Sequence, residues 1–469
     1  MIKKIVTNFT SLFTGEVIAR ACHFFAVIYI ARIFGAAGFG AISFSLAIIS
    51  YFIMLSNPGL GEFGVREISR SRDIKDIAET ILSIRLAAAS VLFVAVLVIA
   101  FLFKKTPTIT YLMIFFGVTL FPYALSLEWV FRGVQEMRYN AYSRIINAFI
   151  YLGAVLLFVK DIQDILKVAL ITVLADLTSC AFYYINYRRK FGGIGLHVDL
   201  RRWGELLRLS LPIFASSAMI IFYFNFGTIA LGIFKDEQSV GFYSAAAKIA
   251  FFIYAVSDLF VASVFPVMSK LYHESREKFA QFMRYCLKIS MVLGIPVGIG
   301  GTVLGPKIIE IVYGPSYAQS GPLFQMMSWF AAINLAGFAL SYSLVSCDRQ
   351  DLYLKVVLYG CLFNIAFNLV GVPLMGYYAP SAALVLTEGI ICVCSFFIVG
   401  KIARLPFLEL SVRPFISAVV MGAILLALFK LNVFILLVIA AVSYFGVLFA
   451  IGGITRDELL RVKEAFAQA

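Results

Sequence analysis

Three polar residues in the first apolar segment have the types and spacing to bind a charged ligand. Glu16, Arg20 and His23 follow one another at intervals of one helical turn, so they share one helix face. A charge at bilayer depth costs about 2.5 to 3.5 kcal/mol on insertion scales, and one that is kept there usually lines a wet cavity. We predict that Arg20 and Glu16 belong to a substrate site. The alternative is an Arg20–Glu16 ion pair that only locks this helix to a neighbour.

Four further charged residues lie inside apolar segments, namely Lys248, Asp176, Asp258 and Glu388. Lys248 could face Arg20 across a central cavity, or its ammonium group could extend to the outer surface. Asp176 is too central in its segment to reach the surface, so it could carry a proton or pair with a buried cation. Histidine titrates near neutral pH, which adds His23 to the candidates. The ion-coupling candidates are therefore Asp176, His23 and Glu16.

The composition requires that these residues be placed in a membrane. Of 469 residues, 62% are hydrophobic and 14% are charged, whereas soluble domains have roughly 45 to 50% and about 25%. A hydrocarbon core near 30 Å needs about 20 apolar residues per helix, so about fourteen spans would use most of the chain. A water-soluble protein and a sizeable soluble domain are both excluded.

The apolar runs predict an all-α integral membrane protein with about 14 transmembrane helices, because a spanning backbone must satisfy its own hydrogen bonds. The predicted spans are 12–34, 40–61, 79–103, 109–128, 141–160, 165–187, 209–233, 241–266, 284–305, 320–345, 355–375, 380–400, 414–430 and 433–452.

The distribution of basic residues predicts the orientation. Lys and Arg total 39 against 26 Asp and Glu, a net charge of +13. An even number of spans puts both termini on one side, and connectors on that side carry roughly four times as many basic residues as the others, the positive-inside pattern. We predict that both termini are cytoplasmic. Arg32 and Arg85, near span ends, are interpreted as interface anchors.

Several kinds of chemistry have no signal in the sequence. The seven cysteines are odd in number and show no CxxC pair, and the histidines have no ligand spacing, so no disulfide framework, metal site or cofactor is predicted. The sequence has no Walker loop and no room for a nucleotide domain, which excludes direct ATP drive. The longest outer connector, 305–319, has Glu310 as its only acid. An integral-membrane glycan-processing enzyme is therefore only an alternative to a transporter, and a nucleic-acid partner is not expected.

The longest connector suggests a boundary between two halves. Residues 188–208 read RRKFGGIGLHVDLRRWGELLR, where Trp203, Leu206 and Leu207 with basic neighbours favour a helix on the inner leaflet. A solvated loop with an interfacial tryptophan is the alternative. The predicted regions are a six-helix lobe 1–190, an amphipathic linker 191–208, a six-helix lobe 209–405, two extra helices 406–454, and a cytoplasmic tail 455–469 with a short surface helix.

The two predicted lobes share a short pattern. Ile33-Phe34 followed by Gly40 recurs about 200 residues later as Ile233-Phe234 followed by Gly241, and both lead into a basic cytoplasmic connector. Six-helix repeats related by pseudo-symmetry are a common transporter plan, with the substrate site between the lobes.

Four stretches of the chain form a recognisable series: ARIFGAAGFGAISFS (31–45), NPGLGEFGVREISR (57–70), EWVFRGVQEMRY (128–139) and SCDRQDLYLK (346–355). Their order and spacing are more specific than any one of them. On these stretches the chain resembles the multidrug/oligosaccharidyl-lipid/polysaccharide exporter superfamily, and within it the Wzx-type polysaccharide flippases, and the resemblance covers most of the chain.

The resemblance implies a multi-pass transporter of the bacterial cytoplasmic membrane. Its substrate would be an oligosaccharide repeat linked to undecaprenyl pyrophosphate, flipped from the inner to the outer leaflet by alternating access for surface polysaccharide (O-antigen) synthesis. Related lipid II flippases use buried basic residues in spans one, two and eight; Arg20 and Lys248 match two of these, and span two has none. Protons, sodium or the membrane potential could drive the cycle. The alternative is the drug-extruding branch of the superfamily, whose members resemble cation binders with acidic residues in span one or span seven. In this chain span one offers Glu16, and span seven offers only Asn225.

Overall fold

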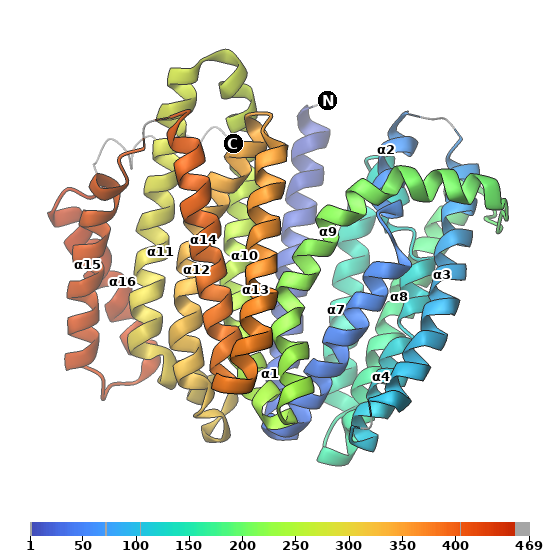
Figure 1. Cartoon of the computed structure of the whole chain (residues 1–469), viewed down its shortest axis with the longest axis horizontal. Helices are drawn as coiled ribbons and strands as arrows, with labels where there is room; N and C mark the ends of the chain where they lie inside the picture. Colours follow the sequence, from blue (N-terminus) through green and yellow to red (C-terminus); the bar gives the residue numbers. More distant parts are fainter. Residues whose placement is uncertain (1, 71–72, 104, 404, 455–469) are drawn as a thin grey trace. The chain divides into compact units, whose positions relative to one another are not determined.

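Helices make up all of the regular structure in the described residues. The computed structural model describes residues 2–70, 73–103, 105–403 and 405–454, without the side chains of 2–14, 213, 216–217, 256, 258–259 and 262–263. The α-helices are α1 (Ile2–Ser56), α2 (Leu60–Arg70), α3 (Ile74–Leu102), α4 (Pro107–Gly117), α5 (Leu120–Leu125), α6 (Glu128–Gly133), α7 (Arg138–Phe158), α8 (Ile165–Phe191), α9 (Leu200–Phe234), α10 (Glu237–Glu274), α11 (Arg276–Tyr313), α12 (Ser320–Ser346), α13 (Gln350–Met375), α14 (Tyr378–Gly400), α15 (Phe407–Ala427) and α16 (Val433–Ala450) (Figure 1). Two 3-10 turns, η1 (Ile162–Asp164) and η2 (Pro315–Tyr317), complete the described elements.

The helices agree with the predicted spans. Within the described residues, 11 segments are long and apolar enough to cross a membrane. One of them, 15–70, covers the first predicted span from residue 15 onward and all of the second, and α9 and α10 hold the seventh and eighth. Each predicted span therefore has a helical counterpart. The predicted class, an all-α integral membrane protein with about fourteen transmembrane helices, is confirmed. The predicted tail at 455–469 lies outside the described residues.

The first helix is broken by a single glycine, between the first and the second predicted span. Gly35 has φ 64° and ψ −175°, and a positive φ is open to glycine because it has no Cβ. The first and second predicted spans are the two halves of α1 on either side of this residue. The polar face with Glu16 and Arg20 therefore belongs to the half before the break.

The chain forms two compact units, residues 1–244 and 245–469. In the first unit α1 is the central helix and packs against α3, α4, α7 and α9, while α8 packs against α4 and α7. The boundary between the units lies within α10, whose first turns belong to the first unit. The lobe boundaries drawn from the sequence stay a prediction.

The linker in front of α9 is fixed to α3. The Gly195 N–H donates to Glu79 Oε1 at 2.8 Å, and the Arg202 guanidinium donates to both carboxylate oxygens of Asp76. Charge-assisted, bidentate contacts of this kind also fix geometry. The segment 192–199 is thus held along the first turns of α3.

The start of α9 is helical, with its apolar residues turned toward the protein. Trp203, Leu206 and Leu207 pack against a buried cluster that α2, α3, α6 and α8 share. The amphipathic spacing predicted a helix, and that part agrees with the structure. These three side chains are half-buried against the first unit, and contact of this helix with the inner leaflet stays a prediction.

The second unit is built on α11, α12, α13 and α14, in which α12 packs against both α11 and α14. Its main apolar cluster lies between α11, α12 and the end of α14. The last two helices, α15 and α16, lie beside α11 (Figure 1) and form a second cluster with it. These are the two helices that the sequence placed outside the repeat.

The two copies of the short repeated pattern touch each other within the first unit. A Cβ on Gly40 would lie 1.7 Å from the carbonyl oxygen of Glu237, and a Cβ on Gly241 would lie 1.8 Å from that of Ala36. The same shift in sequence relates Ala36 to Glu237 and Gly40 to Gly241, so each contact is the counterpart of the other. The pattern therefore marks a reciprocal backbone contact between α1 and α10 that side chains would prevent.

We expect Gly40→Ala and Gly241→Ala each to lower the thermal unfolding midpoint in detergent by several degrees, because the backbones must move apart, and overpacking of this kind costs about 1 to 3 kcal/mol. The matched control is Gly153→Ala on α7, where a Cβ would meet nothing within 4 Å. Unchanged midpoints for both repeat glycines would contradict the close contact.

Candidate functional site

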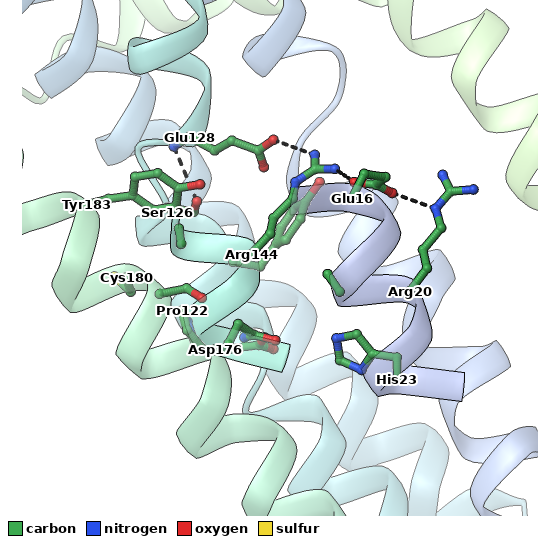
Figure 2. Close-up of a pocket in the computed structure, with 15 residues that line it drawn as sticks. Glu16, Arg20, His23, Pro122, Ser126, Glu128, Arg144, Asp176, Cys180 and Tyr183 are labelled. Atoms are coloured by element: carbon green, nitrogen blue, oxygen red, sulfur yellow. Dashed lines mark hydrogen bonds and ion pairs between the residues drawn. The ribbon is translucent and has the colours of Figure 1, made fainter. Parts of the chain in front are cut away.

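A polar cavity of about 320 Å³ lies inside the first unit. It is formed by the first half of α1, the α5–α6 break, α7 and α8 (Figure 2). Its lining is Glu16, Ala19, Arg20, His23, Pro122, Tyr123, Ser126, Glu128, Ser143, Arg144, Asn147, Asp176, Ser179, Cys180 and Tyr183. Four of the five site residues predicted from sequence, Glu16, Arg20, His23 and Asp176, therefore meet in one cavity.

A chain of ion pairs crosses this cavity. Arg20 Nε donates to Glu16 Oε1 at 2.6 Å, and the Arg144 guanidinium donates to the other oxygen of Glu16. The same guanidinium donates to Glu128 Oε1 at 2.9 Å. Figure 2 shows the order Arg20, Glu16, Arg144, Glu128 across α1, α7 and α6. The predicted Glu16–Arg20 pair is thus the first link of a longer network.

The two arginines of this ion-pair network, Arg20 and Arg144, are both partly exposed to the cavity. The Arg20 side chain is 35% exposed and that of Arg144 is 41%, against 20% for Glu16, which lies between them. A guanidinium offers a planar set of donors that matches carboxylate or phosphate oxygens. The arrangement can therefore receive an anion from the cavity, provided that the anion competes with Glu16 for the same donors.

Asp176 and His23 lie at the other end of the cavity. Asp176 on α8 accepts a hydrogen bond from Asn147 Nδ2 at 3.3 Å, and among the described residues no cation forms an ion pair with it. The His23 ring centroid is 5.1 Å from that of Tyr151. Both are half-buried and border the same cavity (Figure 2). Protons could reach either group from water in the cavity.

Arg85 supports the wall of the cavity from behind. This α3 residue is 2% exposed, so its interpretation as an interface anchor is wrong. Its guanidinium donates to the carbonyl oxygen of Ser126 at 3.1 Å and to that of Tyr123. Since these carbonyls end α5, Arg85 fixes the break from which α6 and Glu128 begin.

Lys248 lies on α10 in the second unit, and its side chain is exposed. It does not line the cavity, whose residues all belong to the first unit. Its proposed place opposite Arg20 stays a prediction.

Sequence reasoning missed Arg144, Glu128 and Asn147 as site residues. Arg144 was counted with the cytoplasmic basic residues, and Glu128 was read only as part of a motif. The available signal was position, because Arg144 and Asn147 fall inside the predicted span 141–160 and Glu128 closes the span before it. Among the described residues, no group of three or more His, Cys, Asp or Glu side chains could hold a metal ion.

Two family models match the chain. The model described as "Polysaccharide biosynthesis protein" matches residues 5–272, and the MatE model matches 212–370. A Shigella dysenteriae protein named "Putative O-antigen transporter" is 22% identical over 76% of this chain and 89% of its own length. "Probable flippase AglR" of Haloferax volcanii is 24% identical over 42% of each chain.

Solved structures share the fold over most of the chain. The lipid II flippase MurJ in an inward closed conformation has a TM-score of 0.77 and 13% identity, covering 93% of this chain and 97% of that one. An inward-facing multidrug resistance MATE family transporter of the MOP superfamily has a TM-score of 0.64 and 14% identity, covering 82% and 95%. This likeness shows a common architecture.

The family assignment agrees with the resemblance drawn from the sequence. The family model and the two relatives named as a transporter and a flippase confirm the choice of a transporter over a membrane enzyme. Because the first family model covers more than half of the chain, the chain belongs to the polysaccharide biosynthesis protein family and is a multi-pass inner-membrane transporter of the Wzx type within the multidrug/oligosaccharidyl-lipid/polysaccharide exporter superfamily.

Proposed function

We propose that the chain flips an oligosaccharide linked to undecaprenyl pyrophosphate from the inner to the outer leaflet by alternating access. The observation that carries this proposal is the pair of half-exposed guanidiniums, Arg20 and Arg144, that hold one carboxylate between them in the cavity. The diphosphate of such a substrate would take the place of that carboxylate. The family assignment and the relatives named as an O-antigen transporter and a flippase support the same substrate class.

The physical demands of this substrate fit the site. A diphosphate-sugar headgroup is large, polar and anionic, so it needs a wet cavity with cations, while its lipid tail stays in the bilayer. The cavity has hydroxyl and amide groups that can bind sugars, among them Ser143, Ser179 and Asn147. In this proposal Arg20 grips the diphosphate in the first unit, and Lys248 supplies a second cation from α10.

A specific observation favours a second candidate, a cation efflux antiporter of the same superfamily. Three carboxylates line the cavity, Glu16, Glu128 and Asp176, against two guanidiniums, and the MatE model matches residues 212–370. The two functions are separated by reconstitution into vesicles. Transport of a lipid-linked oligosaccharide without uptake of a cationic dye supports the flippase, and the reverse result supports the antiporter.

The predicted orientation, with both termini in the cytoplasm, is tested by cysteine labelling. In a variant whose seven cysteines are replaced by serine, we expect new cysteines at Asp161 and Asp236 to react with an impermeant maleimide in whole cells. Cysteines at Gly193 and Glu277 should react only after the membrane is opened. All four positions are exposed. Labelling of Gly193 from outside would require a span to be gained or lost, and would contradict the orientation.

Arg20→Ala is expected to reduce glycan export about ten- to a hundred-fold, because a charge-assisted contact contributes about 1.5 to 3 kcal/mol and each 1.4 kcal/mol is about a factor of ten. Arg20→Lys should fall between, since lysine supplies a point charge without the planar fork. Protein abundance should stay normal, because Glu16 keeps its contact with Arg144. Export and abundance are measured separately in cells.

The matched control is Arg66→Ala, which removes an exposed arginine paired with Glu67 outside the cavity. The competing role for Arg20 is only to neutralise Glu16. If the Glu16→Gln, Arg20→Gln double variant restores export to the wild-type level, that role is correct and the grip on the diphosphate is refuted.

Ion coupling at the cavity is tested by neutralising its titratable groups. If a proton drives the cycle, Asp176→Asn, His23→Gln or Glu16→Gln should flatten the dependence of transport on an imposed pH gradient, because an amide cannot exchange a proton in this range. Asp164→Asn, which removes a carboxylate paired with Lys167 away from the cavity, is the control. Full gradient dependence in all three cavity variants would place coupling elsewhere.

A further inference from the structure

A second polar cavity, of about 640 Å³, lies in the second unit at the start of α15. It is formed by the first turns of α15, by α11 and by Gly453, which follows α16. Its lining is Lys288, Leu408, Glu409, Leu410, Val412, Arg413, Pro414 and Gly453. None of these residues belongs to the transport site described above.

The charged groups of this cavity have both signs. Lys288 on α11 and Arg413 on α15 are the two cations, and Glu409 lies one turn before Arg413 on the same helix. Arg413 is held in place by donating to the carbonyl oxygen of Gly452 at 2.7 Å. A guanidinium has more N–H donors than this one contact uses. The cavity can therefore bind a phosphate at its cations and an ammonium group at its carboxylate.

The surface of α15 beside the cavity is apolar. Leu408 is 75% exposed and Val412 47%, and Ile416 and Val419 continue the exposed row at helical spacing. In a membrane protein such a row contacts acyl chains. A ligand whose polar head occupied the cavity could therefore lay its chains along α15.

We propose that this cavity binds the headgroup of a zwitterionic, amine-bearing phospholipid, phosphatidylethanolamine. Lys288 and Arg413 would contact its phosphate, Glu409 would accept hydrogen bonds from its ammonium group, and its chains would lie on α15. Basic pockets at helix ends are typical lipid headgroup sites. The Glu409 carboxylate disfavours phosphatidylglycerol, because the headgroup of that lipid has no cation to pair with it. Phosphatidylcholine is disfavoured because its quaternary ammonium has no N–H to donate. With this site, α15 and α16 have a role independent of the flippase proposal.

The test is native mass spectrometry of the full chain, purified from micelles that contain equal amounts of phosphatidylethanolamine, phosphatidylglycerol and phosphatidylcholine. We expect the wild type to retain the ethanolamine lipid several-fold more than either other lipid. Glu409→Gln should abolish that preference and favour phosphatidylglycerol, because the two cations remain. Lys288→Ala and Arg413→Ala should each lower retention of phosphatidylethanolamine several-fold, because each removes a contact to its phosphate.

The matched control for Glu409→Gln is Glu310→Gln on α11, and the matched control for Lys288→Ala is Lys270→Ala on α10. Neither residue lines the cavity. Size-exclusion profiles establish that each variant is folded, and should Arg413→Ala fail to fold, Arg413→Lys and Glu409→Gln carry the test. A wild type that prefers phosphatidylglycerol, or a Glu409→Gln variant with an unchanged lipid preference, would overturn the proposal. Soluble phosphoethanolamine should not displace the lipid at equal concentration, and displacement would overturn the assignment to a lipid.

Discussion

The cost of removing a charge from water determines how the first unit is built. At membrane depth a charged group must be paired or reach water, since an uncompensated one costs several kcal/mol. Glu16 satisfies this condition with both carboxylate oxygens, one toward Arg20 and the other toward Arg144. Because Arg144 also holds Glu128, the network fixes α1, α7 and α6 relative to one another. The open side of the cavity supplies water to the arginines that the pairs leave half-exposed.

Length and apolarity were enough to predict the helices, because a membrane imposes nearly the same requirement on every span. The predicted span 320–345 and the helix α12, Ser320–Ser346, differ by one residue. The Glu16–Arg20 pair was also predictable, since residues one turn apart on a helix are neighbours whatever surrounds them. Local helix geometry was therefore enough to predict the Glu16–Arg20 pair, which is the first contact of the network.

The remaining links depend on contacts between distant parts of the chain. Arg144 lies near the start of its predicted span, 141–160, where the positive-inside pattern also expects arginine. Its type and position therefore did not distinguish a surface residue from a cavity residue. Arg85 shows the same ambiguity: it lies near a span end but is buried, and caps the α5–α6 break. The repeated glycine pattern indicated related halves, but only the structure shows Gly40 and Gly241 in reciprocal contact.

The balance of charge in the cavity bears on how a transporter can release what it binds. If the diphosphate binds where Glu16 now lies, binding exchanges one anion for another on the same guanidiniums, and the net gain is the difference between the two sets of contacts. A ligand can shift a conformational equilibrium only by its differential affinity for the two states. An internal carboxylate that returns to Arg20 and Arg144 when the ligand leaves would lower the cost of the empty state, which would otherwise leave two like charges facing each other. On the proposed function, Glu16 thus makes release and return of the empty carrier easier, at the expense of tight binding.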